Sequence, residues 1–195
     1  MFTINPLGRW FDSIDCCPWN ATSGRAHRGE MRVMPRPLYS DEERRRRDMS
    51  RWTTVQGVLA PVQFAVFLIS LGLVLRYLMN GEGLAIATAS VVLKTLLLYT
   101  IMITGSIWER DVFGRYLFAP AFFWEDVVSI LVLALHTTYL VALFSGAVDA
   151  ERLMWLALSA YASYVINATQ FVLKLRAARL QQQAPMIVGA VGHAP

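Results

Sequence analysis

The stretch FAPAFFWEDVVSILVLALH, residues 118–136, combines a long apolar run with three groups that are costly to remove from water. Glu125 and Asp126 stand side by side near its start, and His136 follows about three helical turns later. A mainly apolar segment of about 20 residues can cross the hydrocarbon core of a bilayer as a helix. Ionisable residues inside such helices are rare and mark functional sites by default. The stretch therefore predicts a membrane-spanning helix that carries functional polar groups.

The composition of the whole chain agrees with a membrane protein. Of its 195 residues, 55% are hydrophobic and 16% are charged, and the mean hydropathy is +0.42. Soluble domains are usually about 45–50% apolar and about 25% charged. The net charge of +4 does not indicate nucleic-acid binding, because the basic residues flank apolar segments and form no stripe with aromatic partners. They are better suited to anionic lipid headgroups.

Four apolar segments have the length of a membrane span, at residues 54–79, 84–108, 119–145 and 151–175. In lipid only helices and closed barrels satisfy every backbone hydrogen bond. We therefore predict an all-α membrane protein whose four transmembrane helices form a compact antiparallel bundle. Pro61 and Pro120 lie near predicted segment starts, where proline is tolerated.

The distribution of Lys and Arg predicts the orientation of these helices, because short cytoplasmic loops carry an excess of both. The basic residues predicted on one side are Arg36, Arg44, Arg45, Arg46, Arg47, Arg51, Arg110, Arg115, Lys174, Arg176 and Arg179. The other side has only Arg76 and Arg152. Both termini are therefore expected in the cytoplasm.

The two ends of the chain are expected to lie outside the bundle. Residues 1–33 have no helical or strand period, and residues 1–37 are predicted to be a disordered or mis-annotated extension. One hypothesis is that the true start is Met34, so that the first 33 residues are not translated. Their adjacent Cys16 and Cys17 form no disulfide framework or zinc motif. Ser40 and Glu43 fit a capping box that opens a short polar helix. The helical domain is expected over residues 38–180, with a flexible tail at 181–195.

Several polar residues fall inside the predicted spans and are expected to converge on one cavity. Glu125, Ser129, Val132 and His136 follow a helical spacing that places them on one stripe. Glu125 and Asp126 point about 100° apart, so they are not expected to share a proton. The groups at comparable depths on the other spans are Gln63, Lys94, Tyr164, Asn167 and Gln170.

Each of these residues also has a purely structural interpretation. Lys94 can form an ion pair with Glu125 or Asp126, and Asn167 can hydrogen-bond across helices. His136 can be a satisfied packing residue. Aromatic residues near the predicted segment ends fit the belt that membrane proteins place at the headgroup level, namely Trp52, Trp108, Trp124 and Trp155.

Long and unusual strings of this sequence allow a more specific interpretation. They include VQGVLAPVQF (55–64), TGSIWE (104–109), FAPAFFWED (118–126), LALHTTYL (133–140) and AYASYVINATQFVLKLRAARL (160–180). In these strings the chain closely resembles the 2-vinyl bacteriochlorophyllide hydratase family of bacteriochlorophyll biosynthesis. The resemblance runs in order from about Leu38 to Leu180.

The resemblance implies addition of water to the C3-vinyl group of chlorophyllide a, or of 3-vinyl bacteriochlorophyllide a, to give the 3-(1-hydroxyethyl) derivative. Such a reaction needs a general acid, and burial favours the neutral, proton-carrying form of a carboxyl group. We therefore predict Glu125 or Asp126 as the acid, with Glu125 favoured because its stripe contains His136. His136 is predicted to orient water or to bind the magnesium of the substrate.

The substrate propionate is expected to pair with Lys94, Arg110 or Arg115. Lys94 beside the acid would keep that carboxyl group ionised, so Lys94 is expected to face the other carboxylate or the propionate. The remaining predicted substrate-binding residues are Gln63, Glu109, Asn167, Gln170 and Tyr164. No redox cofactor or metal of the protein's own is expected, because the tetrapyrrole brings its own magnesium.

The resemblance also places the protein in a bacterial inner membrane, cytoplasmic or intracytoplasmic, among lipids and with neighbouring bacteriochlorophyll-biosynthesis enzymes as candidate partners. An alternative function is a non-catalytic pigment-binding or assembly protein, which would use the same histidine and aromatic groups. A small transporter is disfavoured because the sequence has no inverted repeat and no pair of Gly- or Pro-broken spans.

Overall fold

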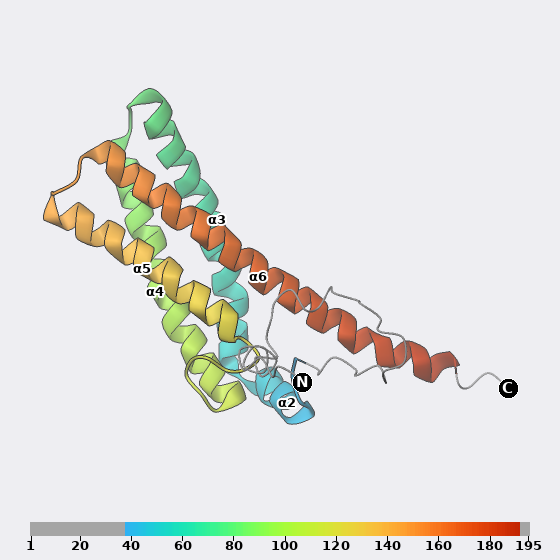
Figure 1. Cartoon of the computed structure of the whole chain (residues 1–195). Helices are drawn as coiled ribbons and strands as arrows, with labels where there is room; N and C mark the ends of the chain where they lie inside the picture. The colour runs from blue at the N-terminus through green and yellow to red at the C-terminus, as the bar shows by residue number, and fades with distance from the viewer. Residues whose placement is uncertain (1–37, 192–195) are drawn as a thin grey trace, which may run out of the picture.

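A computed structural model describes the backbone of residues 38–191 and the side chains of residues 38–179. Over this range the chain forms five helices and no strand (Figure 1). They are α2 (Asp41–Met49), α3 (Arg51–Asn80), α4 (Leu84–Phe113), α5 (Phe123–Ser145) and α6 (Ala150–Val191). Helices α3, α4 and α5, and the part of α6 from Ala150 to Arg179, are long and apolar enough to cross a membrane. The predicted all-α fold with four apolar spans is confirmed.

Some predicted boundaries differ from those of the structure. The third span was expected from residue 119, whereas α5 begins at Phe123, because Phe118 adopts a left-handed backbone with a φ of 60° and Pro120 follows it. Helix α3 begins at Arg51, so Pro61 lies inside the helix and not near its start. The start predicted at Met34 and the cysteines Cys16 and Cys17 lie outside the described residues. The flexibility of residues 181–195 stays a prediction.

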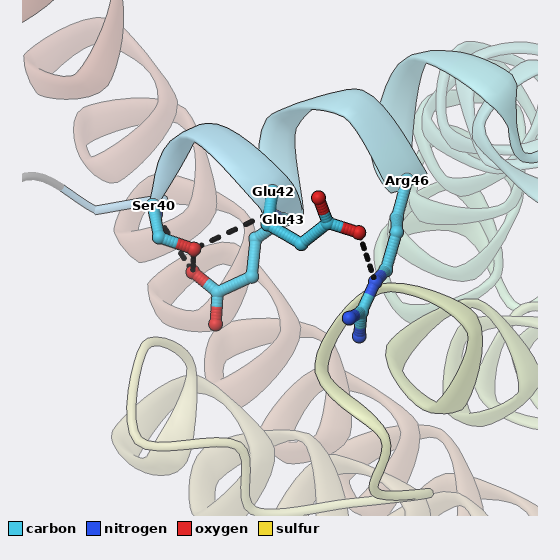
Figure 2. A network of polar contacts seen from close by, with 4 residues as sticks. All are labelled: Ser40, Glu42, Glu43 and Arg46. Atoms are coloured by element: carbon cyan, nitrogen blue, oxygen red, sulfur yellow. Dashed lines mark hydrogen bonds and ion pairs between the residues drawn. The ribbon is translucent and has the colours of Figure 1, made fainter.

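The capping box predicted at the start of α2 is confirmed (Figure 2). The Ser40 backbone N–H donates to Glu43 Oε2 at 2.7 Å, and the Glu43 backbone N–H donates to Ser40 Oγ at 3.3 Å. One turn later, Arg46 pairs with Glu42 at 3.3 Å on the exposed face. The two capping-box hydrogen bonds satisfy backbone N–H donors that the start of a helix otherwise leaves without partners.

Helix α2 and the start of α3 are fastened to the end of α4. The Ser50 hydroxyl donates to Asp111 Oδ2 at 2.8 Å, and the Trp108 indole donates to Thr53 Oγ1 at 3.0 Å. Tyr39 is buried with Val112 and Phe122 in a small aromatic cluster at this end. Burial raises the pKa of Tyr39 to about 12. The polar helix α2 therefore covers one end of the bundle.

The turns between helices divide the bundle into two ends (Figure 1). The α3–α4 turn and the α5–α6 turn lie together at one end, while α2 and the α4–α5 segment lie at the other. Gly81 ends α3 and Gly114 ends α4. Their backbone φ values are 74° and 77°, which residues with a side chain rarely adopt. Helix α3 packs mainly on α4, and α5 packs mainly on α6.

The core between the helices is apolar and aromatic. The Phe67 ring lies 5.4 Å from the Tyr161 ring and 4.9 Å from the Tyr164 ring, which joins α3 to α6. Outward-facing side chains are also apolar: Ile69, Ile86 and Val141 are each 63% exposed. A bundle that is apolar on its outside as well as in its core is suited to lipid.

Candidate functional site

The first part of the site is a pair of buried carboxyl groups from two helices. Glu109 near the end of α4 and Asp126 near the start of α5 are 5% and 4% exposed. Their side chains lie close enough to share a hydrogen bond. Because ionised carboxylates are acceptors only, this hydrogen bond requires a proton on one of the two groups. The pair is therefore suited to hold an exchangeable proton away from water. We call these two residues the carboxyl pair.

The segment between α4 and α5, residues 114–122, holds the carboxyl pair in place. The Phe118 backbone N–H donates to Asp126 Oδ2 at 2.7 Å, and the Ala119 N–H donates to Glu109 Oε2 at 3.4 Å. Phe118 is the non-glycine residue with a positive φ within residues 38–191. Residues held in sparsely populated backbone regions cluster at functional sites. Here that conformation directs two neighbouring N–H groups toward the two carboxyl groups.

Glu125, which the sequence favoured as the acid, is engaged elsewhere. Its Oε2 lies 2.6 Å from Lys174 Nζ, and the two side chains are 1% and 18% exposed. Lys174 also lies over the Phe122 ring at 5.0 Å. The Glu125 carboxylate is therefore already occupied by a charged partner. The geometry therefore favours Asp126, together with Glu109, for proton donation.

Lys94 does not pair with either predicted carboxylate. Its side chain is fully buried, and its Nζ lies 3.6 Å from the centre of the Tyr164 ring. Within the described residues its ammonium group has no hydrogen-bond partner. The reason is depth: Lys94 lies fifteen residues before Glu109, or about 22 Å along α4. The carboxylates lie at the end of the bundle, beyond the reach of a lysine near its middle.

His136 is held in a defined orientation. Its Nδ1 lies 2.8 Å from the Val132 carbonyl oxygen. Since a carbonyl only accepts, Nδ1 carries the hydrogen, and Nε2 of the neutral ring presents its lone pair. Nε2 is buried without a hydrogen-bond partner among the described residues. The ring packs 5.9 Å from the Tyr161 ring. Such a ring can bind a metal or accept a hydrogen bond.

Three amide side chains complete the polar residues at mid-depth. The Asn167 Nδ2 donates to Ser129 Oγ at 2.9 Å, as the cross-helix interpretation expected. Atoms of Gln63, Asn167 and Gln170 remain buried without a partner in the part of the chain with described side chains. Because native proteins satisfy most buried polar groups, several unsatisfied atoms between α3 and α6 point to a ligand site.

The structure therefore arranges the predicted residues at two levels and not in one cavity. The predicted stripe is confirmed, since Glu125, Ser129, Val132 and His136 are all buried on α5. However, Asp126 and His136 are ten residues apart, or about 15 Å along the helix. We call the deeper level, built around Lys94, His136, Gln63 and Asn167, the polar centre. Of the predicted boundary arginines, Arg110 donates to the Tyr116 hydroxyl and Arg115 is exposed.

An apolar groove lies beside the polar centre. It lies between α3 and α6, has a volume of about 220 Å³, and is lined by Phe67, Leu71, Leu158, Tyr161, Ala162 and Val165. Tyr161 contacts His136, and Phe67 contacts the Tyr164 ring on which Lys94 rests. A flat apolar ligand dissolved in the bilayer would thus meet a lipid-facing groove next to His136. A second groove of about 460 Å³ lies between α3 and α4 and is also apolar.

The pairing of Glu109 with Asp126 was not predicted from the sequence, although both residues were candidates. One signal was present. Glu109 follows the second predicted span and Asp126 lies about two turns into the third, so both lie toward the same side of the membrane. The ion pair of Glu125 with Lys174 was also missed, because no acidic partner was assigned to Lys174.

The fold and the site define a multi-pass α-helical membrane protein with buried carboxyl, lysine and histidine side chains between its helices. Residues 39–177 match the family described as 2-vinyl bacteriochlorophyllide hydratase. The chain belongs to that family, and the predicted resemblance is confirmed.

Two curated relatives carry the name 2-vinyl bacteriochlorophyllide hydratase. The protein from Cereibacter sphaeroides is 66% identical over 149 residues, which cover 76% of this chain and 92% of the relative. The protein from Rhodobacter capsulatus is 64% identical over 144 residues, which cover 74% of this chain and 84% of the relative. No solved structure matches the chain.

Proposed function

We propose that this protein adds water to the C3-vinyl group of chlorophyllide a, or of 3-vinyl bacteriochlorophyllide a. The product is the 3-(1-hydroxyethyl) derivative, an intermediate of bacteriochlorophyll a biosynthesis. The family and the names of the two relatives support this activity. The structural observation that carries the proposal is the carboxyl pair, Glu109 and Asp126, buried at the end of the helical bundle.

The reaction assigned to the carboxyl pair begins with proton transfer. The shared proton passes to the terminal vinyl carbon, and the π electrons of the double bond form the new C–H bond. The adjacent carbon becomes cationic, with its charge spread into the macrocycle. A water oxygen then attacks that carbon, and the proton it loses returns to the carboxyl pair. The pair therefore serves first as general acid and then as base, and ends as it began.

The two backbone N–H donors stabilise the carboxyl pair in the state that follows proton transfer. After proton transfer the carboxyl pair is fully ionised and carries two negative charges. The N–H groups of Phe118 and Ala119 already point at its oxygens, so they stabilise this charge without rearrangement. No net oxidation or reduction occurs when water adds to an alkene. We therefore propose that the protein uses no redox cofactor.

For His136 we propose the role of axial ligand to the magnesium of the substrate. Its Nδ1 contact with the Val132 carbonyl orients the ring and leaves the Nε2 lone pair available. Its separation of about 15 Å along α5 from Asp126 favours this role over water activation at the vinyl carbon. A macrocycle is wide enough to reach toward both levels, whereas a single water is not.

The role of His136 can be tested with matched pigments. His136→Ala is expected to raise the Kd of the magnesium pigment about tenfold or more and to leave the Kd of the magnesium-free pigment unchanged, because only the first has a metal to bind. Absorbance titration of the purified protein measures both. Unchanged binding of both pigments together with a lower kcat would assign His136 to water orientation instead.

We further propose an antiparallel bundle with both termini in the cytoplasm of a bacterial inner membrane. Two sets of contacts support the antiparallel arrangement, because residue numbers fall on one helix as they rise on its neighbour. The sets are Ser50–Asp111, Gln56–Thr104 and Ser70–Ser90 for α3 and α4, and Glu125–Lys174, Ser129–Asn167 and His136–Tyr161 for α5 and α6. Single cysteines placed at Glu82 and at Tyr116 test this orientation. An impermeant reagent added outside the cell is expected to label the cysteine at position 82 and not the one at position 116.

The activity itself is tested by incubating purified protein with the vinyl pigment in ¹⁸O-labelled water, with nothing else added. We expect an alcohol product that carries one labelled oxygen. The alternative, a pigment-binding or assembly protein, predicts a bound pigment of unchanged mass. That second result would remove the hydratase proposal.

A further inference from the structure

The polar centre contains a buried lysine without an acidic partner among the described residues. Lys94 is fully buried, and none of the ion pairs among residues with described side chains includes it. The acidic residues at the nearest level of α5 are already engaged, Glu125 with Lys174 and Asp126 with Glu109. What Lys94 contacts is the face of the Tyr164 ring, at 3.6 Å.

An aromatic face offsets only part of the cost of burying an ammonium group. The cation–π attraction is weaker than the penalty for removing the charge from water, which is recovered fully only by an opposite charge and hydrogen bonds. Charged residues inside a membrane bundle therefore usually have a partner or mark a ligand site. Lys94 has the environment of a residue whose partner is an anionic ligand.

The surroundings of Lys94 suit a carboxylate. Lys94 and His136 pack against two rings of α6 that are one turn apart, Tyr164 and Tyr161, and Asn167 follows Tyr164 by one further turn. On the facing helix, Gln63 is buried one turn before Phe67, which contacts Tyr164. The buried Nε2 of Gln63 is a donor without a partner among the described side chains. An ammonium group and an amide N–H from two helices can both donate to carboxylate oxygens.

We propose that Lys94 binds the propionate carboxylate of the tetrapyrrole substrate and thereby fixes the rotation of the macrocycle. This inference rests on the proposed function. A single axial bond from His136 to magnesium leaves the ring free to turn about that bond. The propionate is on a different pyrrole unit from the vinyl group, so pairing it with Lys94 selects one rotational position. Lys94 is thus a binding and positioning residue that directs the vinyl group toward the carboxyl pair.

The test compares two forms of one pigment, the free acid and its propionate methyl ester, in binding titrations without turnover. The wild-type protein is expected to bind the free acid at least about tenfold more tightly than the ester, because only the free acid has the charge that Lys94 recognises. Lys94→Met is expected to bind both forms with the affinity that the wild type has for the ester. Retained ester binding shows that this variant is folded.

Matched variants distinguish Lys94 from the other candidate partners of the propionate. Arg110→Met and Arg115→Met remove the two boundary cations, and both are expected to keep the preference for the free acid. Lys94→Arg keeps the charge and is expected to keep part of the preference. If the preference survives in Lys94→Met, or disappears in an arginine variant, the proposal is overturned.

If Lys94→Met fails to fold, the affinities of the wild-type protein for the free acid and for the ester still test the role of Lys94. Equal affinity for acid and ester, in a protein that binds and hydrates the vinyl pigment, would overturn the role of Lys94 and leave the hydratase proposal intact. A wild-type protein that neither binds nor hydrates the pigment would overturn the proposed function, and this inference with it.

Discussion

Asp126→Asn is expected to lower kcat for hydration of the vinyl pigment by about 10²–10⁴-fold, the usual contribution of a general acid or base. An amide cannot supply the proton that we propose Glu109 and Asp126 share in the wild type. Glu109→Gln is expected to have a similar effect, since either change removes the shared proton. Pigment binding, measured by absorbance titration, is expected to change little because both residues lie away from the polar centre.

The double variant sharpens this prediction. If Glu109 and Asp126 act as one unit, Glu109→Gln with Asp126→Asn is expected to be little worse than either single change. Asp111→Asn is the matched control, because it makes the same chemical change at an exposed position on the same end of α4. It is expected to retain wild-type kcat. Full activity in both Glu109→Gln and Asp126→Asn would rule out the carboxyl pair as the proton donor. If only Glu125→Gln is folded and inactive, Glu125 is the acid, as first favoured from the sequence.

The second large effect is expected on stability, from the ion pair between Lys174 and Glu125. Lys174→Met leaves a carboxylate that is 1% exposed without its partner 2.6 Å away. Breaking a buried ion pair from one side typically costs about 3–5 kcal/mol in the free energy of unfolding. Glu125→Gln is expected to cost less, because Lys174 is 18% exposed and can extend toward water. Unfolding in mixed detergent and SDS micelles, followed by circular dichroism, measures both.

Two controls separate this effect from a general loss of charge. The double variant Glu125→Leu with Lys174→Met replaces the pair by apolar groups and is expected to recover most of the stability. Arg152→Met removes one member of an exposed pair with Asp149 and is expected to change the free energy of unfolding by less than about 1 kcal/mol. If Lys174→Met and Arg152→Met lower the free energy of unfolding equally, the buried pair contributes no more to stability than the exposed pair.

Sequence alone determined the fold class, the four spans and the family. The reason is that lipid allows few backbone solutions, so apolar length and the capping box at Ser40 are sufficient to place helices. It also determined which polar residues are buried, because helical spacing puts Glu125, Ser129 and His136 on one face of α5 whatever that face contacts.

Only the tertiary structure decided which of these residues are partners. The pairing of Glu109 with Asp126, and of Glu125 with Lys174, depends on how far α4 and α6 slide along α5. The same registers leave Lys94 against Tyr164 at mid-depth, away from every carboxylate it was expected to meet. Spacing along one helix contains no information on the register between helices, since that register is set by side-chain packing and by turns such as residues 114–122.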